Sequence, residues 1–214
     1  MAVKRRYEST HRQDQARQTR RAILDAAAEL FVDPGYAATP LTAVAARAGV
    51  AVQTLYKVFG SKKALLSALV DVTIAGDDDP VPLPARGFVE AVQAEGDLRA
   101  KLERFAVHLT EVHARQARVM TALAGAATAD PEAAAIWRKN VEDRRRGMTM
   151  FAGHLVASGL VTKPVEAVAD VLWLAMDIRN YDWLVRERGW SAAEFRRWYV
   201  TSVAGALEDE GVRP

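Results

Sequence analysis

Three residues at fixed spacing constrain the fold of this 214-residue chain more than any other feature. Ala45 is small enough for two helices to cross closely, and Gly49, four positions later, allows a tight turn. Leu55, six positions after the glycine, can pack the second helix back onto the first. Apolar and small residues at helical spacing over 41–48 and 51–59 surround this glycine. The pattern predicts a helix-turn-helix.

The second helix of the pair has a predicted outward face. A turn of about 100° per residue directs Val50, Leu55 and Phe59 inward. The residues left facing outward suit DNA, because Gln pairs with adenine, Val meets the thymine methyl group, and Lys and Tyr reach phosphates. We predict that DNA is contacted by residues on and beside this helix, namely Thr42, Ala51, Val52, Gln53, Thr54, Tyr56, Lys57 and Lys62.

Two helix starts next to this face carry N-cap residues. Thr39, followed by Pro40, is predicted to cap the helix over 41–48, and Ser61 is predicted to cap the helix that follows. Backbone N–H groups at both starts, with the side chains of Thr42 and Lys62 beside them, are predicted to clamp DNA phosphates.

The surrounding segments resemble the DNA-binding domain of the tetracycline-repressor (TetR) family. The resemblance rests on RRAILDAAAELF, GYAATPLTAVAARAGV and TLYKVFGSKKALL, and it covers residues 19–70. It implies an all-α fold of roughly nine or ten helices, in which a three-helix DNA-binding domain with a helix-turn-helix precedes a helical ligand-binding and dimerisation domain. Ala51 departs from the family pattern, in which many relatives have Ser or Thr as the cap of the recognition helix.

The N-terminal part of the chain is basic. Residues 1–63 hold eleven Lys and Arg against five Asp and Glu, a net charge of +6, whereas the remaining residues hold 18 against 22, a net charge of −4. This asymmetry concentrates positive potential where DNA phosphates would lie. Residues 1–18 are predicted to be a disordered basic arm, either solvated or reaching into a minor groove. An amphipathic helix is predicted over 19–32 and ends at Asp33-Pro34-Gly35.

A change in composition predicts the boundary between two domains. Gly76 and three aspartates are followed by Pro80, Pro82 and Pro84, which cannot continue a helix. The first domain is therefore predicted over 19–75, including a linking helix that starts at Ser61, and the second domain over 76–214. Cap and proline signals predict helices in the second domain over 87–94, 97–113 with a further segment to 128, 130–157, 165–188 and 191–207.

The last two predicted helices have wide apolar faces. Only Glu166, Asp170 and Asp177 are polar between Val165 and Ile178, so this helix must be covered on more than one side. Members of the TetR family pack their last two helices against the same helices of a second subunit. The resemblance therefore implies a homodimer with an interface formed by Val168, Leu172, Ala175, Phe195, Trp198, Tyr199 and Val203. The alternative is that both helices only close a core within one chain.

The core of the second domain is expected to hold a small molecule, because family members usually enclose a ligand pocket there. The resemblance implies a hydrophobic effector bound by Phe105, His108, Met120, Trp137, Phe151, Trp173 and Asp177. Asp177 lies in the apolar run LWLAMDI and needs a partner, since burying a lone carboxylate is costly. It could face the dimer axis, pair with an Arg or line the pocket, and a structural ion pair is favoured. The run Arg144-Arg145-Arg146 is predicted to be a solvated helix face.

Sequence signals of catalysis and of metal binding are missing. The chain has no Cys, its four His residues form no H-E-x-x-H motif, and it has no G-x-S-x-G elbow or Gly-rich phosphate loop. We therefore expect no catalytic residue, no metal site and no cofactor. The first residues do not form a signal peptide, and no stretch reaches the roughly 18 apolar residues of a membrane span. These features favour a cytoplasmic, nucleoid-associated protein with no membrane contact.

The predicted function is regulation of transcription. We expect a homodimeric repressor that binds double-stranded DNA at a palindromic, inverted-repeat operator and is released by a hydrophobic small molecule. One alternative is a ligand-independent DNA-binding regulator or activator with a filled core. Another alternative, disfavoured by the missing catalytic motifs, is a helical enzyme.

Overall fold

The computed structural model describes residues 2–76 and 87–208, with side chains from Asp14 onward, and every regular element in these ranges is helical. The prediction of an all-α fold is confirmed. The prolines on which the predicted domain boundary rests lie outside the described residues. Two units can be distinguished: the first combines the residues up to Thr73 with Arg118–Trp137, and the second combines Ile74–Ala117 with the residues from Arg138 onward.

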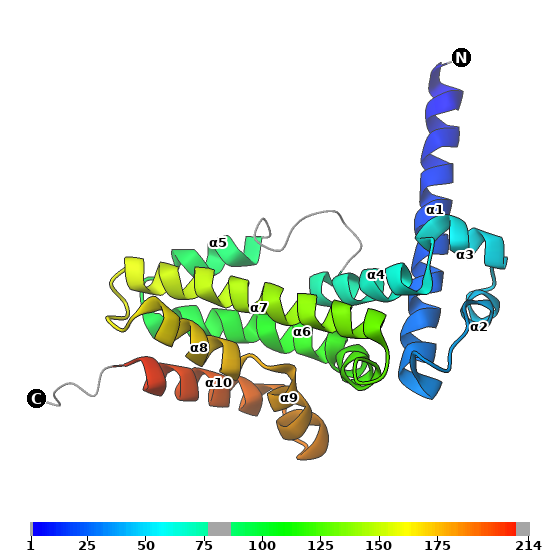
Figure 1. Cartoon of the computed structure of the whole chain (residues 1–214). Helices are drawn as coiled ribbons and strands as arrows, with labels where there is room; N and C mark the ends of the chain where they lie inside the picture. The colour runs from blue at the N-terminus through cyan, green and yellow to red at the C-terminus, as the bar shows by residue number, and fades with distance from the viewer. Residues whose placement is uncertain (1, 77–86, 209–214) are drawn as a thin grey trace, which may run out of the picture. The chain divides into compact units, whose positions relative to one another are not determined.

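The first helix begins earlier than predicted. α1 spans Ala2–Leu30 and is followed by a π-helical turn, η1, over Phe31–Gly35 (Figure 1). Residues 2–18 are therefore helical, in contrast to the predicted disordered arm, because this segment has no Gly or Pro and many Arg and Gln, which favour helices. The predicted end of the helix is confirmed, since Asp33 leaves helical geometry at φ −146° and ψ 112°.

The helix-turn-helix is formed by α2, Leu41–Arg47, and α3, Val52–Phe59 (Figure 1). Gly49 lies between these helices at φ +68°, a backbone conformation that residues with a Cβ atom rarely adopt. Ala45 and Leu55 are both fully buried, so the small-glycine-apolar spacing does bring the two helices together.

α4 spans Lys62–Ala75 and begins where the sequence predicts. Ser61 accepts a hydrogen bond from the backbone N–H of Ala64 at 3.1 Å, which is the geometry of an N-cap. The inward face of this helix is buried and consists of Leu65, Leu66, Leu69 and Val70.

Thr39 does not cap α2, and this corrects the prediction. α2 begins after Pro40, which is extended and makes no side-chain bond to the helix. The buried hydroxyl of Thr39 donates instead to the carbonyl oxygens of Leu30, at 2.7 Å, and Gly35, at 2.8 Å. Carbonyl groups at the end of a helix lack an intrahelical donor, so a buried hydroxyl beside them is stabilising.

After α4 the chain forms α5 (Gly87–Ala94), α6 (Leu98–Ala126), α7 (Pro131–Ala157), α8 (Val165–Ala175), α9 (Ile178–Tyr181), the π-helical η3 (Asp182–Glu187) and α10 (Ala192–Leu207). The predicted bounds of α5 and the predicted ends of α7 and α10 agree with the structure. α6 is one unbroken helix instead of the two predicted segments, because no Pro or Gly interrupts its sequence before Gly125.

The predicted caps of the three long helices are confirmed. Asp97 accepts a backbone N–H at the start of α6 at 2.9 Å, and Asp130 accepts two at the start of α7, at 2.8 and 2.9 Å. Ser191 and Glu194 form a capping box at the start of α10, with reciprocal bonds of 3.2 and 2.7 Å. These helix starts are encoded by residues within four positions of each other, which is why the sequence predicts them correctly.

The single helix predicted over 165–188 is broken after α8. Asp177 is extended, at φ −63° and ψ 133°, and its carboxylate accepts the backbone N–H of Arg179 as the N-cap of α9. The side chain of Asn180 donates to the last two carbonyl oxygens of α8, at 2.8 and 3.2 Å. These side chains satisfy backbone groups that would otherwise require a continuous helix, so the break costs few hydrogen bonds.

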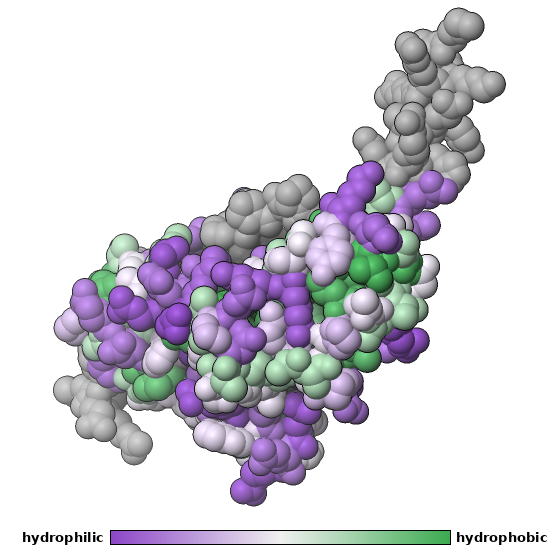
Figure 2. Space-filling model, turned by 45° about the vertical axis from the view of Figure 1, so that its right-hand side comes forward, coloured by the Kyte–Doolittle hydropathy of each residue, from purple (hydrophilic) through white to green (hydrophobic). Residues whose placement is uncertain are grey.

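α8 packs against α10 within the second unit (Figure 1). On the face drawn in Figure 2, hydrophilic side chains predominate and hydrophobic side chains form smaller groups between them. No helix among the described residues is both long and apolar enough to cross a membrane.

Candidate functional site

The outward face of α3 presents three kinds of polar group. The amide of Gln53, the phenol of Tyr56 and the ammonium group of Lys57 belong to exposed residues, and Ala51 at the start of the helix is also exposed. Of the other residues predicted to contact DNA, Thr42 is exposed, whereas Val52 and Thr54 are half-buried. Because Leu55 is fully buried on the opposite side, the helix is held with this polar face toward solvent.

The start of α3 has no side-chain cap. Ala51 has the extended backbone of an N-cap, at φ −67° and ψ 145°, but its methyl group can accept no hydrogen bond. The N–H groups of Val52 and Gln53 therefore remain for an acceptor from outside the helix, such as a phosphate oxygen.

Two contacts orient the helix-turn-helix on α1. Arg47 of α2 donates through Nε to the carboxylate of Glu29 at 2.7 Å. The guanidinium carbon of Arg20 lies 4.6 Å from the centroid of the Phe59 ring at the end of α3. An exposed ion pair and one cation–π contact each contribute on the order of 0.5–1 kcal/mol, so they set orientation more than they stabilise the fold.

Lys62, predicted to clamp a phosphate, packs on an aromatic ring. Its Nζ lies 4.3 Å from the centroid of the Tyr36 ring. Burial lowers the pKa of Lys62, and the nearby carboxylate of Asp130 partly opposes that. Burial, with the charges of Asp130 and Glu132, raises the pKa of Tyr36 to about 12. The turn before α7 thus lies close to the start of α4, where the Lys62 side chain packs on the Tyr36 ring.

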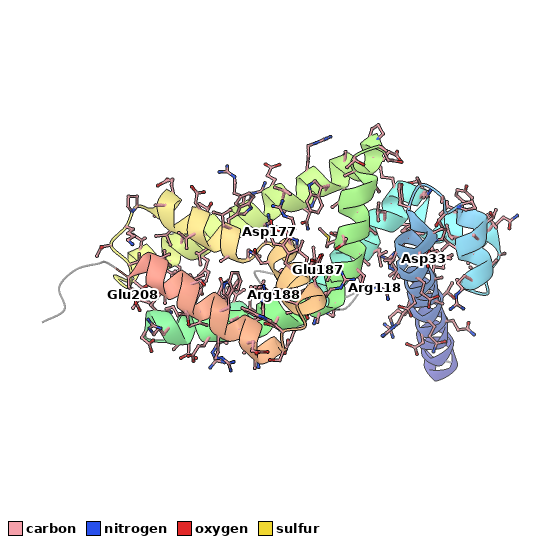
Figure 3. The ribbon with its side chains drawn as sticks, turned by 90° about the horizontal axis from the view of Figure 1, so that it is seen from below. Asp33, Arg118, Asp177, Glu187, Arg188 and Glu208 are labelled. Carbon is pink, nitrogen blue, oxygen red and sulfur yellow. The ribbon has the colours of Figure 1, made fainter. Side chains whose placement is uncertain are left out.

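Asp177 forms the structural ion pair that the sequence favours. Its carboxylate lies 2.9 Å from Nη2 of Arg144 and accepts from Nε of Arg179, also at 2.9 Å; Figure 3 shows its place beside α8. The guanidinium carbon of Arg144 lies 5.0 Å from the centroid of the Trp173 ring. Burial raises the pKa of Asp177, but the hydrogen bonds from Arg179 and the charge of Arg144 outweigh it and hold this pKa at about 2.

The aromatic residues predicted to line a pocket make separate ring pairs in the second unit. Phe105 stacks on Phe151 with the ring centroids 5.2 Å apart. His108 stacks on Phe88 with the ring centroids 3.6 Å apart. Two further residues of the predicted pocket, Met120 and Trp137, belong to the first unit. The predicted lining therefore divides into groups, and a single pocket formed by all of them stays a prediction.

Residues 23–69 match the family model described as bacterial regulatory proteins of the tetR family. The chain carries a TetR-family domain. This match contains the whole helix-turn-helix and most of α4, so the resemblance predicted from the sequence is confirmed. A comparison with curated protein sequences finds no match.

The TetR-like fold extends beyond this domain. A TetR-family regulator from Mesorhizobium loti is 22% identical with a TM-score of 0.67, and 90% of this chain and 96% of that one are covered. A TetR-family regulator from a Rhodococcus species is 17% identical with a TM-score of 0.68, with 89% and 99% covered. The fatty acid degradation regulator of Bacillus halodurans is 16% identical with a TM-score of 0.67, with 88% and 96% covered.

Most of the interface residues predicted from the TetR resemblance are buried within one chain. Five of the seven predicted residues are fully buried: Val168, Leu172, Phe195, Tyr199 and Val203. Ala175 and Trp198 are half-buried. A side chain that is already covered offers no area to a second subunit, so an interface on α8 and α10 must use the exposed neighbours of these residues.

The sequence did not predict that Arg144 faces inward in the TetR-like fold. It was predicted to lie on a solvated face, but only 14% of its side chain is exposed. Arg145 and Arg146 are exposed, as predicted. Arg144 follows Val141 by three positions and precedes the buried Met148 by four, and this helical spacing could have revealed it.

Lys101 is a second buried cation that was not predicted from the sequence. Its ammonium group donates to the carbonyl oxygens of Val92, at 3.2 Å, and Gln93, at 2.6 Å. Val92 and Gln93 lie in the last turn of α5. Lys101, on α6, therefore caps the C-terminal end of α5. Its place between Leu98 and Phe105 on one helix face is the only sequence signal of its burial.

Proposed function

We propose that this protein is a homodimeric transcriptional repressor that binds a palindromic operator in the cytoplasm and is released by a hydrophobic small molecule. The proposal is supported by the TetR-like regulator fold and carried by one observation. Gln53, Tyr56 and Lys57 are exposed together on a helix that follows a glycine turn, and this is the arrangement with which a recognition helix enters a major groove.

The distribution of charge supports the same assignment. Residues 1–63 carry a net charge of +6, from eleven basic and five acidic residues. A basic segment around the recognition helix attracts the phosphate backbone and accelerates association with DNA. Association driven by charge is independent of base sequence, so specificity falls to Gln53 and its neighbours on α3.

The homodimer is supported by an apolar stripe on the outside of α8. Ala167 and Leu174 are exposed, and Val171 between them is half-buried. The spacing of four and three residues puts these side chains on one helix face. A dimer formed by two copies of this face would carry two recognition helices, one for each half of a palindrome.

Release by a hydrophobic effector is proposed by analogy. The fatty acid degradation regulator of Bacillus halodurans has a similar fold. Fold similarity alone does not define a ligand, so the effector of this protein has to be found by a binding screen.

The proposal is tested by two substitutions on α3. After the operator has been selected from random DNA, Gln53→Ala should cost about 1–3 kcal/mol at one base pair and relax the preference there. Lys57→Ala should weaken binding to all sequences alike and lower the salt slope by about one. Lys139→Ala, at an exposed lysine of α7, is the matched control and should change neither quantity.

Two outcomes would contradict this function. A Gln53→Ala protein that keeps the base preference of the wild type would show that Gln53 does not read a base. Selection of sites without two-fold symmetry would show that the protein does not bind DNA as a symmetric dimer.

A further inference from the structure

Buried polar atoms without a hydrogen-bond partner are concentrated in the second unit. Five such side-chain atoms occur among the described residues, namely His113 Nε2, Arg144 Nε, His154 Nε2, Trp173 Nε1 and Tyr199 Oη. All five belong to the second unit. Because about 90% or more of buried polar atoms in proteins are hydrogen-bonded, this concentration needs a physical explanation.

Three of these atoms can only donate a hydrogen bond. Arg144 Nε and Trp173 Nε1 each carry a hydrogen and have no acceptor capacity. Nδ1 of His113 lies 3.4 Å from the amide nitrogen of Gln116, which can only donate, so Nδ1 accepts and the ring proton is on Nε2. Burial also lowers the pKa of His113 to about 3, so the ring is neutral near pH 7. Each of the three atoms therefore requires an acceptor.

The three donors belong to one neighbourhood around Arg144. Its guanidinium carbon lies 5.0 Å from the centroid of the Trp173 ring, and its Nη2 lies 2.9 Å from the carboxylate of Asp177. Its charge also acts on His113 and helps to lower the pKa of that ring. His113 in turn stacks on Tyr181 with the ring centroids 5.5 Å apart. Arg144 and His113 thus each lie beside an aromatic ring.

Ion pairs beside these donors involve three guanidinium groups and two carboxylates. Arg144 and Arg179 share the carboxylate of Asp177, each at 2.9 Å. Arg186 pairs with Asp182 at 2.9 Å. The side chains of Arg179 and Arg186 are 64% and 43% exposed, so solvent screens their charges, whereas Arg144 is only 14% exposed. An anionic acceptor would form charge-assisted hydrogen bonds with the donors and give the Arg144 guanidinium a second acceptor.

We propose that this cluster binds the head group of an amphiphilic carboxylate, with Arg144, Trp173 and His113 as donors and the neighbouring aromatic rings around the apolar part. The inference rests on the proposed function, because it names the chemical class of the effector. A carboxylate has only acceptors, about four lone pairs on two oxygens, and so matches three donors. An alcohol offers fewer acceptors, and an ammonium group offers none.

The test compares three compounds with the same alkyl chain, octanoate, 1-octanol and octylammonium. Binding to the full-length protein is measured by calorimetry and by the shift in melting temperature. Octanoate should bind at least about tenfold more tightly than either of the others, because charge-assisted hydrogen bonds contribute about that factor each. It should also weaken operator binding, since the two binding events are linked.

Two variants locate the head group. His113→Phe and Trp173→Phe each remove one N–H group but keep a ring against Tyr181 or Arg144, and each should weaken octanoate binding about tenfold. Trp183→Phe is the matched control, because the same substitution at a residue that is 55% exposed should leave octanoate binding unchanged. In proton–nitrogen correlation NMR spectra, the indole N–H signal of Trp173 is identified by its absence from Trp173→Phe. This signal should shift when octanoate is added to the wild type.

The inference is overturned if the three compounds bind alike, if none of them binds, or if both variants bind octanoate as the wild type does. These results are separate from the DNA-binding part of the proposed function, which is measured by operator affinity without any compound. A protein that binds its operator and is released by 1-octanol but not by octanoate would be a ligand-responsive repressor without this head-group site.

Discussion

Thr39 shows how one side chain can serve a different helix from the one that its sequence position suggests. Ser, Thr and Asp before a helix usually accept a backbone N–H, and Thr39 precedes α2 by two positions. Its hydroxyl donates instead to carbonyl oxygens at Leu30 and Gly35. The difference between donating and accepting can be measured.

Thr39→Asp separates the two roles. Asp is a strong N-cap but has no hydrogen to donate when ionised, so it should destabilise the protein by more than about 2 kcal/mol through unsatisfied carbonyls and a buried charge. Thr39→Ser keeps the hydroxyl and should cost less than about 1 kcal/mol. Urea denaturation measures both. A Thr39→Asp protein as stable as the wild type would restore the N-cap assignment.

His113 makes stability depend on pH. Burial lowers its pKa from 6.5 to about 3, so below pH 6.5 the unfolded chain binds a proton that the folded chain does not. The free energy of unfolding should therefore fall by about 2 kcal/mol from this residue between pH 7 and pH 5. His113→Phe should lack that part of the slope. Identical pH slopes for the wild type and the variant would contradict the buried neutral histidine.

At the scale of helices, the starts of α3 and α4 differ in one oxygen atom. The Ser61 side chain supplies an oxygen to the first turn of α4, whereas the Ala51 side chain supplies none to the first turn of α3. The two helices are adjacent in the sequence, so they form a matched pair for measuring what a cap contributes.

Ser61→Ala should destabilise the protein by about 1 kcal/mol, because an N–H group of α4 loses its acceptor. Ala51→Ser should stabilise it by roughly 0.5–1 kcal/mol, because the extended backbone of residue 51 already has the geometry of a cap. Both values come from urea denaturation without DNA. An Ala51→Ser protein of unchanged stability would mean that the first N–H groups of α3 are satisfied in another way.

At the scale of the molecule, a charged substitution should have different effects at the exposed and at the buried residues of α8 and α10. Leu174 on α8 is 61% exposed, whereas Val203 on α10 is fully buried. A charged side chain at position 174 would be solvated in the monomer. A charged side chain at position 203 would be buried in the core of its own chain.

Leu174→Glu should weaken the proposed dimer at least about tenfold without changing the helical content, because a carboxylate would be buried only on association. Val203→Glu should instead destabilise each chain by several kcal/mol. Sedimentation and circular dichroism measure the two effects. Met150→Glu, at an equally exposed position of α7, is the control and should leave association unchanged. A Leu174→Glu dimer as tight as the wild type would exclude α8 from the interface.

Local signals in the sequence were sufficient for most helices and for the face of α3. Asp97, Asp130 and Ser191 start helices through bonds to residues at most three positions away, and such bonds need no knowledge of the rest of the fold. Gly49 turns the chain for a reason equally local, its positive φ. The helical period of the apolar residues likewise sufficed to predict that Leu55 is buried and that Gln53 is exposed.

Partners that come from distant segments could not be predicted in this way. Arg144 and Asp177 are 33 positions apart, so their ion pair follows from how α7 and α9 pack and not from either local sequence. The same holds for Lys62 on the ring of Tyr36 and for the burial of Val203 within its own chain. Periodicity says that a side chain lies on an apolar or a polar helix face, but the element covering that face depends on long-range packing, which a single local pattern does not contain.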